Sequence, residues 1–228
     1  MELSALKDKI KKSYTGTKEE LNRILELVES DESVFPFNEY EYLICNLIEK
    51  KGLTFEKYLE IRKRYHYENP NLHYFELVGK TFGGIMESQI QLLCSELKRS
   101  TSNKFDFLLD TIKIEVKAGR AVEEKSKKPL VEKALASNTT KKFDIILEQI
   151  KPDYCDVFIW VVVYRDVIVF WVLSSKEVKN LNGYSSKQHA TGNMGQFHIK
   201  PANIEAIDKY KVKGEEIKRA IIDASKRN

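Results

Sequence analysis

The chain has 228 residues, of which 42% are hydrophobic and 32% are charged, a balance typical of a globular protein with one large domain or a core with a helical appendage. It contains no run of the ~20 apolar residues that a membrane-spanning helix needs, and its first residues lack the apolar core of a signal peptide, so we expect a cytoplasmic protein with no membrane partner. The three cysteines are far apart and indicate neither a disulfide framework nor a zinc site.

The formal net charge is only +4, but the basic residues are unevenly distributed. Residues 111–142 contain nine Lys or Arg and four Glu, which gives this segment a local net charge of +5. A concentration of positive charge favours a polyanionic partner, whose phosphates it can neutralise. A solvated lysine-rich loop would show the same composition.

The first part of the chain is predicted to be helical. Thr17 and the acidic residue three positions later form a capping-box pattern, which begins a helix that ends near Ser30. Asn38 and Thr54 are the expected N-caps of two further helices. We therefore predict an N-terminal helical region over residues 1–78, and no residue pattern in it indicates a chemical activity.

A further helix is predicted after the glycine pair Gly83-Gly84. Apolar residues then recur at helical spacing and form one stripe, made of Met86, Ile90, Leu93, Cys94 and Leu97. Glu87 lies at the border of this stripe and would lean toward whatever the helix covers. A glutamate in the first turn of a helix is also favoured by the helix dipole, whatever its function.

Residues 103–120 are predicted to form a β-hairpin. Apolar and polar residues alternate on both sides of Asp110-Thr111, which we take as the two-residue loop. This register places Asp106 directly opposite Glu115, so both side chains point to one face, where Lys117 joins them. The other face receives the apolar side chains Phe105, Phe107, Leu109, Ile112, Ile114 and Val116.

Two facing carboxylates repel each other unless a cation lies between them. Asp106 and Glu115 are therefore candidate ligands of a hard divalent ion such as Mg²⁺, which prefers carboxylate and phosphate oxygens. Lys117 would stand beside the metal, where an ammonium can offset negative charge in the transition state of phosphate hydrolysis. A hairpin with one solvated face would also alternate charged residues in this way.

The sequence Phe105-Asp106, followed after nine positions by Glu115-Val116-Lys117, resembles the signature of the PD-(D/E)XK nuclease superfamily. Phe105 stands where the variable proline of that signature would be. The family within this superfamily that the chain most resembles is that of the type II restriction endonucleases.

The segment Phe82–Ile90 resembles the helix that precedes the hairpin in this superfamily. The resemblance implies that Asp106 and Glu115 bind the metal, that Lys117 is the catalytic lysine and that Glu87 is a supporting acid. It also implies Mg²⁺ as the cofactor and a restriction-endonuclease-like core.

Beyond the hairpin, two short helices are predicted over Val131–Ala136 and Phe143–Ile150. Asp156–Tyr164 and Val167–Leu173 are continuous apolar runs rich in β-branched residues, which favours strands buried on both faces at the centre of a sheet. A last amphipathic helix is expected over about Lys213–Ser225.

These elements predict the α/β class, with a mixed central sheet of about five strands flanked by helices. The sheet and its helices would form a core over residues 79–228, preceded by the N-terminal helical region.

The stretch Gly183–Ile199 is polar, is punctuated by glycines and is rich in hydrogen-bonding side chains, as a loop that reads DNA bases would be. An ordinary surface loop would also fit this composition. The candidate DNA-binding residues are Arg120, next to the hairpin strand, and Lys187, Gln188, His189 and Asn193 in this stretch.

The function that we infer from the sequence is that of a Mg²⁺-dependent type II restriction endonuclease. It would hydrolyse phosphodiester bonds at a short site in double-stranded DNA, as a homodimer, because palindromic sites match two-fold symmetric proteins. The alternatives are a DNA repair nuclease or junction resolvase of the same fold, and a non-catalytic DNA-binding protein.

Overall fold

The computed structural model describes residues 17–30, 68–187 and 194–228, together with seven scattered residues between Ser4 and Gly16. The chain divides into two compact units, residues 1–73 and residues 74–228. No helix within the described parts is both long and apolar enough to cross a membrane.

In the first unit, the predicted capping box of the first helix is present. Helix α2 spans Lys18–Ser30, the Thr17 hydroxyl accepts a hydrogen bond from the Glu20 amide (3.2 Å), and the Glu20 carboxylate accepts one from the Thr17 amide (3.1 Å). The helices predicted from Asn38 and Thr54 lie outside the described residues.

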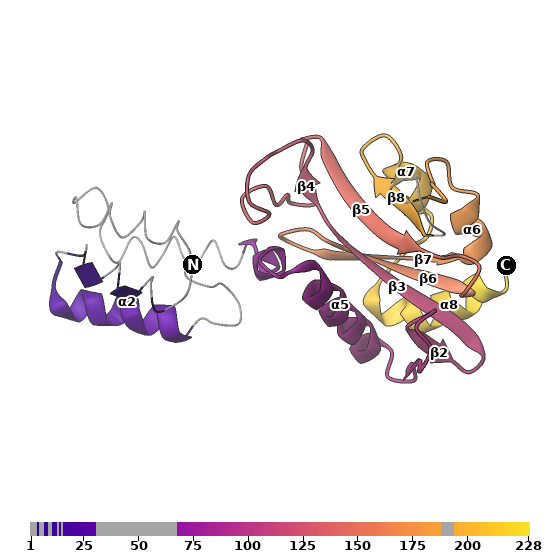
Figure 1. The fold of residues 1–228 in the computed structure, drawn as a ribbon, viewed down its shortest axis with the longest axis horizontal. Helices are drawn as coiled ribbons and strands as arrows, with labels where there is room; N and C mark the ends of the chain where they lie inside the picture. Colours follow the sequence, from indigo (N-terminus) through magenta and orange to yellow (C-terminus); the bar gives the residue numbers. More distant parts are fainter. Residues whose placement is uncertain are drawn as a thin grey trace. The chain divides into compact units, whose positions relative to one another are not determined.

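The second unit contains a six-stranded main sheet with the order β1-β2-β3-β6-β7-β9 (Figure 1). Strands β3 and β6 are parallel and the other neighbours are antiparallel, so the sheet is mixed, as predicted, with one strand more than expected. Its strands are β1 (Lys98–Arg99), β2 (Phe107–Leu109), β3 (Ile112–Arg120), β6 (Val157–Val163), β7 (Ile168–Ser174) and β9 (Lys211–Val212). The two apolar runs predicted at its centre are β6 and β7, and every residue of β6 is buried.

A second sheet of three strands has the order β4-β5-β8, formed by Val122–Glu123, Phe143–Ile150 and Gly195–Ile199. The helix predicted over Phe143–Ile150 is wrong, because this segment is strand β5. Phe143, Ile145 and Leu147 are buried and alternate with more exposed residues, which is the period of a strand. The helix predicted over Val131–Ala136 is also wrong, since these residues form turns and a bridge from Ala134 to Val122.

The second sheet packs on one face of the main sheet. Phe158, Trp160 and Val162 of β6 form one buried cluster with residues of β5 and β8, including Leu147 and Phe197. Gly119 of β3 marks a close approach of the two sheets, because a Cβ there would lie 2.7 Å from the Ile145 side chain and 3.1 Å from the Ile146 carbonyl oxygen.

Two helices lie on the other face of the main sheet, where α5 (Gly79–Leu93) contacts β3 and α8 (Ile217–Ser225) contacts β6 and β7 (Figure 1). Helix α5 begins at Gly79, earlier than predicted, and runs through Gly83 and Gly84. Its buried stripe also begins a turn earlier, at Phe82, and continues through Met86 and Ile90.

The remaining short helices are η1 (Leu72–Phe75), α6 (Ser175–Lys179), α7 (Ile204–Asp208) and η2 (Gly214–Glu216). Helix α8 follows η2 directly and buries Ile217, Ile221 and Ala224 on one face, so the predicted amphipathic helix at the end of the chain is present, although it begins at Ile217.

Candidate active site

The β2-β3 hairpin has the predicted register. Phe107 pairs with Ile114, and Leu109 pairs with Ile112, across a two-residue turn in which Asp110 has a φ of 54°. The amide of Asp106 donates to the Ile114 carbonyl oxygen (2.9 Å), which continues the ladder one step beyond β2. The predicted geometry, with Asp106 facing Glu115, is therefore present.

The apolar face of the hairpin is also mostly as predicted. Phe107, Leu109, Ile114 and Val116 are buried, and Ile112 is half-buried. Phe105 differs, because it lies outside β2 and packs against the buried cluster between the two sheets.

Glu115 and Lys117 lie side by side on the opposite face of β3. The Lys117 Nζ is 2.5 Å from the Glu115 Oε1, and the side chains are only 17% and 8% exposed. The Asp106 Oδ2 accepts a hydrogen bond from the Val116 amide (2.7 Å), which fixes the orientation of that carboxylate. The structure thus brings two carboxylates and one ammonium together in a largely buried position. We call Asp106 and Glu115 the acidic pair, and Lys117 lies beside Glu115.

The electrostatics of this position are unfavourable for one of its charges. The pKa of Glu115 is raised to about 7, chiefly by burial; the positive charges of Lys117 and Lys151 oppose this rise, and the negative charge of Asp106 adds to it. The Lys117 ammonium therefore does not fully offset the cost of a negative charge on the buried Glu115, which faces the carboxylate of Asp106. An added cation between Asp106 and Glu115 would relieve both the burial and the repulsion.

The donor set fits a hard divalent ion, but it is small. Two carboxylates can hold Mg²⁺, which usually keeps several waters or substrate oxygens in its coordination sphere. Among the described residues, no group of three or more His, Cys, Asp or Glu side chains could hold a metal. Asp106 and Glu115 would thus leave most coordination positions to water and to a phosphate.

Glu87 is not part of this cluster. Its carboxylate pairs with the Arg99 guanidinium (2.9 Å), and Arg99 stacks over the Phe107 ring at 5.1 Å from the centroid. Phe107 pairs with Ile114, so this group lies on the face covered by α5, whereas Glu115 points to the other face of the sheet. Because α5 begins at Gly79, Glu87 lies in the middle of the helix and not in its first turn, so its ion pair with Arg99, and not the helix dipole, accounts for its position.

Arg120 also points away from the acidic pair. Its guanidinium donates to the Leu77 carbonyl oxygen (2.6 Å) and stacks over the Phe82 ring at 4.0 Å. Burial lowers the pKa of Arg120. This side chain fastens the start of α5 to the end of β3, and it is engaged inside the fold.

The predicted base-reading stretch is described only in part. Ser185 and Gln196 form an antiparallel bridge that closes a loop, and Lys187 is exposed just inside it. Gln188, His189 and Asn193 lie outside the described residues. The last residues of the stretch are strand β8, which pairs with β5.

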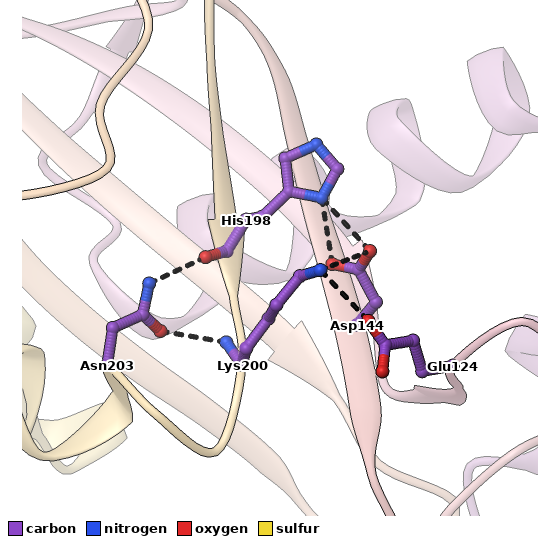
Figure 2. Close-up of polar contacts among 5 residues, drawn as sticks. All are labelled: Glu124, Asp144, His198, Lys200 and Asn203. Carbon is purple, nitrogen blue, oxygen red and sulfur yellow. Dashed lines mark hydrogen bonds and ion pairs between the residues drawn. The ribbon is translucent and has the colours of Figure 1, made fainter.

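A polar network on the outer face of the second sheet was not predicted from the sequence (Figure 2). Both oxygens of Asp144 on β5 lie within 3.0 Å of the His198 Nδ1 on β8, and the Lys200 Nζ is 3.0 Å from Glu124 and 3.6 Å from Asp144. Asn203 completes the network by donating to the His198 carbonyl oxygen (2.8 Å). The network ties β5, β8 and the end of β4 together, and no sequence spacing could have indicated it, because its members are brought together only by sheet pairing.

Two residues near the acidic pair were also missed, and they lie in the connection between β5 and β6. Lys151 acts electrostatically on Glu115, and Tyr154 is 40% exposed.

Comparison of the chain with models of protein families, with curated proteins and with solved structures finds no match.

Proposed function

We propose that this chain is a Mg²⁺-dependent endonuclease with a restriction-endonuclease-like core, which hydrolyses phosphodiester bonds at a short specific site in double-stranded DNA. The observation that carries the proposal is the convergence of Asp106, Glu115 and Lys117 on one face of the β2-β3 hairpin. Ion pairs occur at many exposed places among the described residues, but Glu115 is the one buried carboxylate there, and a second carboxylate, that of Asp106, acts on it.

The acidic pair and Lys117 have distinct roles in this proposal. Asp106 and Glu115 would hold Mg²⁺, which supplies charge stabilisation at the phosphoryl group and a more acidic water. The Val116 amide fixes the Asp106 carboxylate, so its orientation does not have to be organised during the reaction. The Lys117 ammonium, held by Glu115, would offset the negative charge that develops on the phosphoryl oxygens.

The proposed enzyme would act as a homodimer on a palindromic site, because each two-fold copy would place one acidic pair at one strand. The expected result of sedimentation analysis is a mass of twice the chain when cognate DNA is bound.

The test of the proposed function is cleavage of long duplex DNA by the purified chain with Mg²⁺. We expect discrete fragments from the wild type, and at least a hundredfold slower cleavage after Asp106→Ala, Glu115→Ala or Lys117→Ala, since each removes a metal ligand or the transition-state cation. DNA binding in Ca²⁺ should be retained by the two acidic variants, because they lose negative charge that repels phosphate.

Glu123 and Lys141 provide the matched control. They form a lysine–carboxylate ion pair (3.2 Å) that is exposed and has no second carboxylate facing it. Glu123→Ala and Lys141→Ala should leave cleavage within about twofold of wild type, as expected of an exposed ion pair. Cleavage within tenfold of wild type by Asp106→Ala or Glu115→Ala would rule out the proposal, and a smear of random fragments would favour a repair nuclease over a restriction enzyme.

A further inference from the structure

The connection between β5 and β6 stands beside the acidic pair. It follows a bulge in β5 near Gln149, and bulges turn the end of a strand in a new direction. The Tyr154 amide donates to the Lys151 carbonyl oxygen (3.1 Å), which closes a turn. Asp156 then makes two hydrogen bonds of 2.8 Å with the backbone of Lys113 on β3. The turn is therefore held firmly against the hairpin that carries Glu115.

Tyr154 projects an aromatic ring from this turn. The residue is 40% exposed, although its neighbour Cys155 is buried, so the backbone on which the ring stands is anchored. The Lys104 Nζ lies 5.1 Å from the centroid of the ring. Lys104 precedes Asp106 by two positions, and the neighbour of Tyr154, Cys155, interacts electrostatically with Glu115 and Lys117, so the ring and the ammonium come from segments beside the acidic pair.

Lys104 and Lys151 differ from other lysines of the second unit in having no carboxylate within ion-pair distance among the described residues. By contrast, Lys179, Lys141 and Lys200 are each paired with a carboxylate at 3.2 Å or less. The positive charge of Lys151 acts on Glu115. Two ammonium groups that form no ion pair, near a site with two carboxylates, provide positive charge that favours the approach of a polyanion.

We propose that Lys104, Lys151 and Tyr154 form a nucleotide-binding rim, in which the ammonium groups hold backbone phosphates and the Tyr154 ring stacks on an unpaired nucleobase next to the scissile bond. An aromatic ring flanked by basic residues is the arrangement that proteins use to bind single-stranded nucleic acid. Bases in a paired duplex are stacked on each other, and an already unpaired base costs least to bring onto the ring.

This inference rests on the proposed nuclease function and names its substrate more closely. The preferred DNA would carry an unpaired nucleotide beside the scissile phosphodiester, whether the nucleotide is bulged in the substrate or extruded by the protein. Because every base has a π face, the rim would act with any base at that position.

The test is binding of the full chain to two labelled duplexes of random sequence, one fully paired and one with a single unpaired nucleotide, in Ca²⁺ to prevent turnover. We expect the wild type to bind the second duplex about tenfold more tightly, which is the usual effect of one stacked base. Tyr154→Leu should abolish this preference, and Tyr154→Phe should keep it, because phenylalanine retains the ring.

Lys104→Gln tests the phosphate contact separately. It should weaken binding to both duplexes and reduce the slope of log affinity against log salt by about one. The matched control is Lys209→Gln, because Lys209 lies 4.9 Å from the Tyr210 ring at the other end of the main sheet, beside β9. That variant should bind both duplexes as the wild type does, with the same salt slope.

The inference is overturned if Tyr154→Leu retains the preference for the unpaired nucleotide, or if the wild type has none. A wild type that cleaves DNA without this preference would refute the rim and leave the proposed function standing. Conversely, a preference that depends on Tyr154 in a chain that does not cleave DNA would support the rim and refute the nuclease. If Tyr154→Leu does not fold, the test relies on Lys104→Gln, because Lys104 is exposed. An unchanged slope of log affinity against log salt in that variant would also refute the rim.

Discussion

Glu115 affects both the stability of the fold and the proposed chemistry. Its carboxylate is buried beside Asp106, and its pKa is raised from 4.5 to about 7. In the unfolded chain this group would lose its proton near pH 4.5, so the folded state holds more protons between that pH and about 7. Stability in this window must fall as the pH rises, by an amount on the order of 3 kcal/mol in the absence of metal.

Glu115→Gln should therefore make the metal-free protein more stable at pH 7.5 and leave its stability near pH 4 almost unchanged, because glutamine stays neutral. The measurement is denaturant unfolding at several pH values in EDTA. Mg²⁺ should raise the stability of the wild type at pH 7.5 and not that of Glu115→Gln, since binding to the folded state alone stabilises it. If the free energy of unfolding changes with pH equally in the two proteins, the pKa of Glu115 is not raised by folding.

The residues of the acidic pair could be placed from the sequence because a hairpin with a two-residue loop fixes its own register. Glu87 and Arg120 could not, because their side chains are directed by Arg99, Phe82 and a backbone carbonyl group that only the packed fold brings near. Lys104 and Tyr154 meet from distant segments, and no local period connects them.

At the scale of elements, the second sheet is the feature that sequence patterns did not reveal. Ile145 and Ile146 of β5 are adjacent, so the apolar residues of this strand fit a short helix as well as a strand. The pairing of β5 with β8 decides between them, and it joins segments about fifty positions apart. By contrast, β6 and β7 were predicted correctly, because long β-branched runs favour buried strands in any context.

The close approach of the two sheets predicts an asymmetry between two glycines. Gly119→Ala should destabilise the protein by about 1–3 kcal/mol, because the new methyl group would meet the Ile145 side chain and the rigid Ile146 carbonyl group. Gly84→Ala should be neutral or stabilising by up to about 1 kcal/mol, since nothing lies within 4 Å of that position in helix α5.

Thermal unfolding of both glycine variants measures this difference. The melting temperature should fall for Gly119→Ala and stay equal or rise for Gly84→Ala. A Gly119→Ala protein as stable as the wild type would show that the two sheets can move apart at this position. Lys117, two residues before Gly119 on β3, would then be held less rigidly.

At the scale of the whole molecule, the second unit contains all the elements on which the proposed site depends. Residues 74–228 contain both sheets, the acidic pair with Lys117 and the nucleotide-binding rim. The sequence predicted a helical region ahead of an α/β core, with the core beginning at residue 79. The structure places the division between His73 and Tyr74, within the short helix η1.

A fragment of residues 68–228, which keeps η1 whole, should therefore fold cooperatively without the preceding chain. We expect a single unfolding transition and the same Mg²⁺-dependent stabilisation at pH 7.5 as in the full chain, because Asp106 and Glu115 are both retained. A fragment that also ends at residue 187 is the control. It lacks β8, β9 and α8, so β5 loses one of its two neighbouring strands and the main sheet loses an edge strand and the helix that buries Ile217 and Ile221, and it should not fold.

Circular dichroism and calorimetry distinguish these outcomes, and cleavage assays then assign the base-reading surface. If the 68–228 fragment cuts at the same sites as the full chain, the reading residues lie in the second unit, where Gly183–Ile199 is the candidate. Discrete cleavage by the full chain and random cleavage by the fragment would assign the reading to residues 1–67. A fragment that folds but gains no stability from Mg²⁺ would contradict the proposed metal site itself, because its ligands and their supporting strands would all be present.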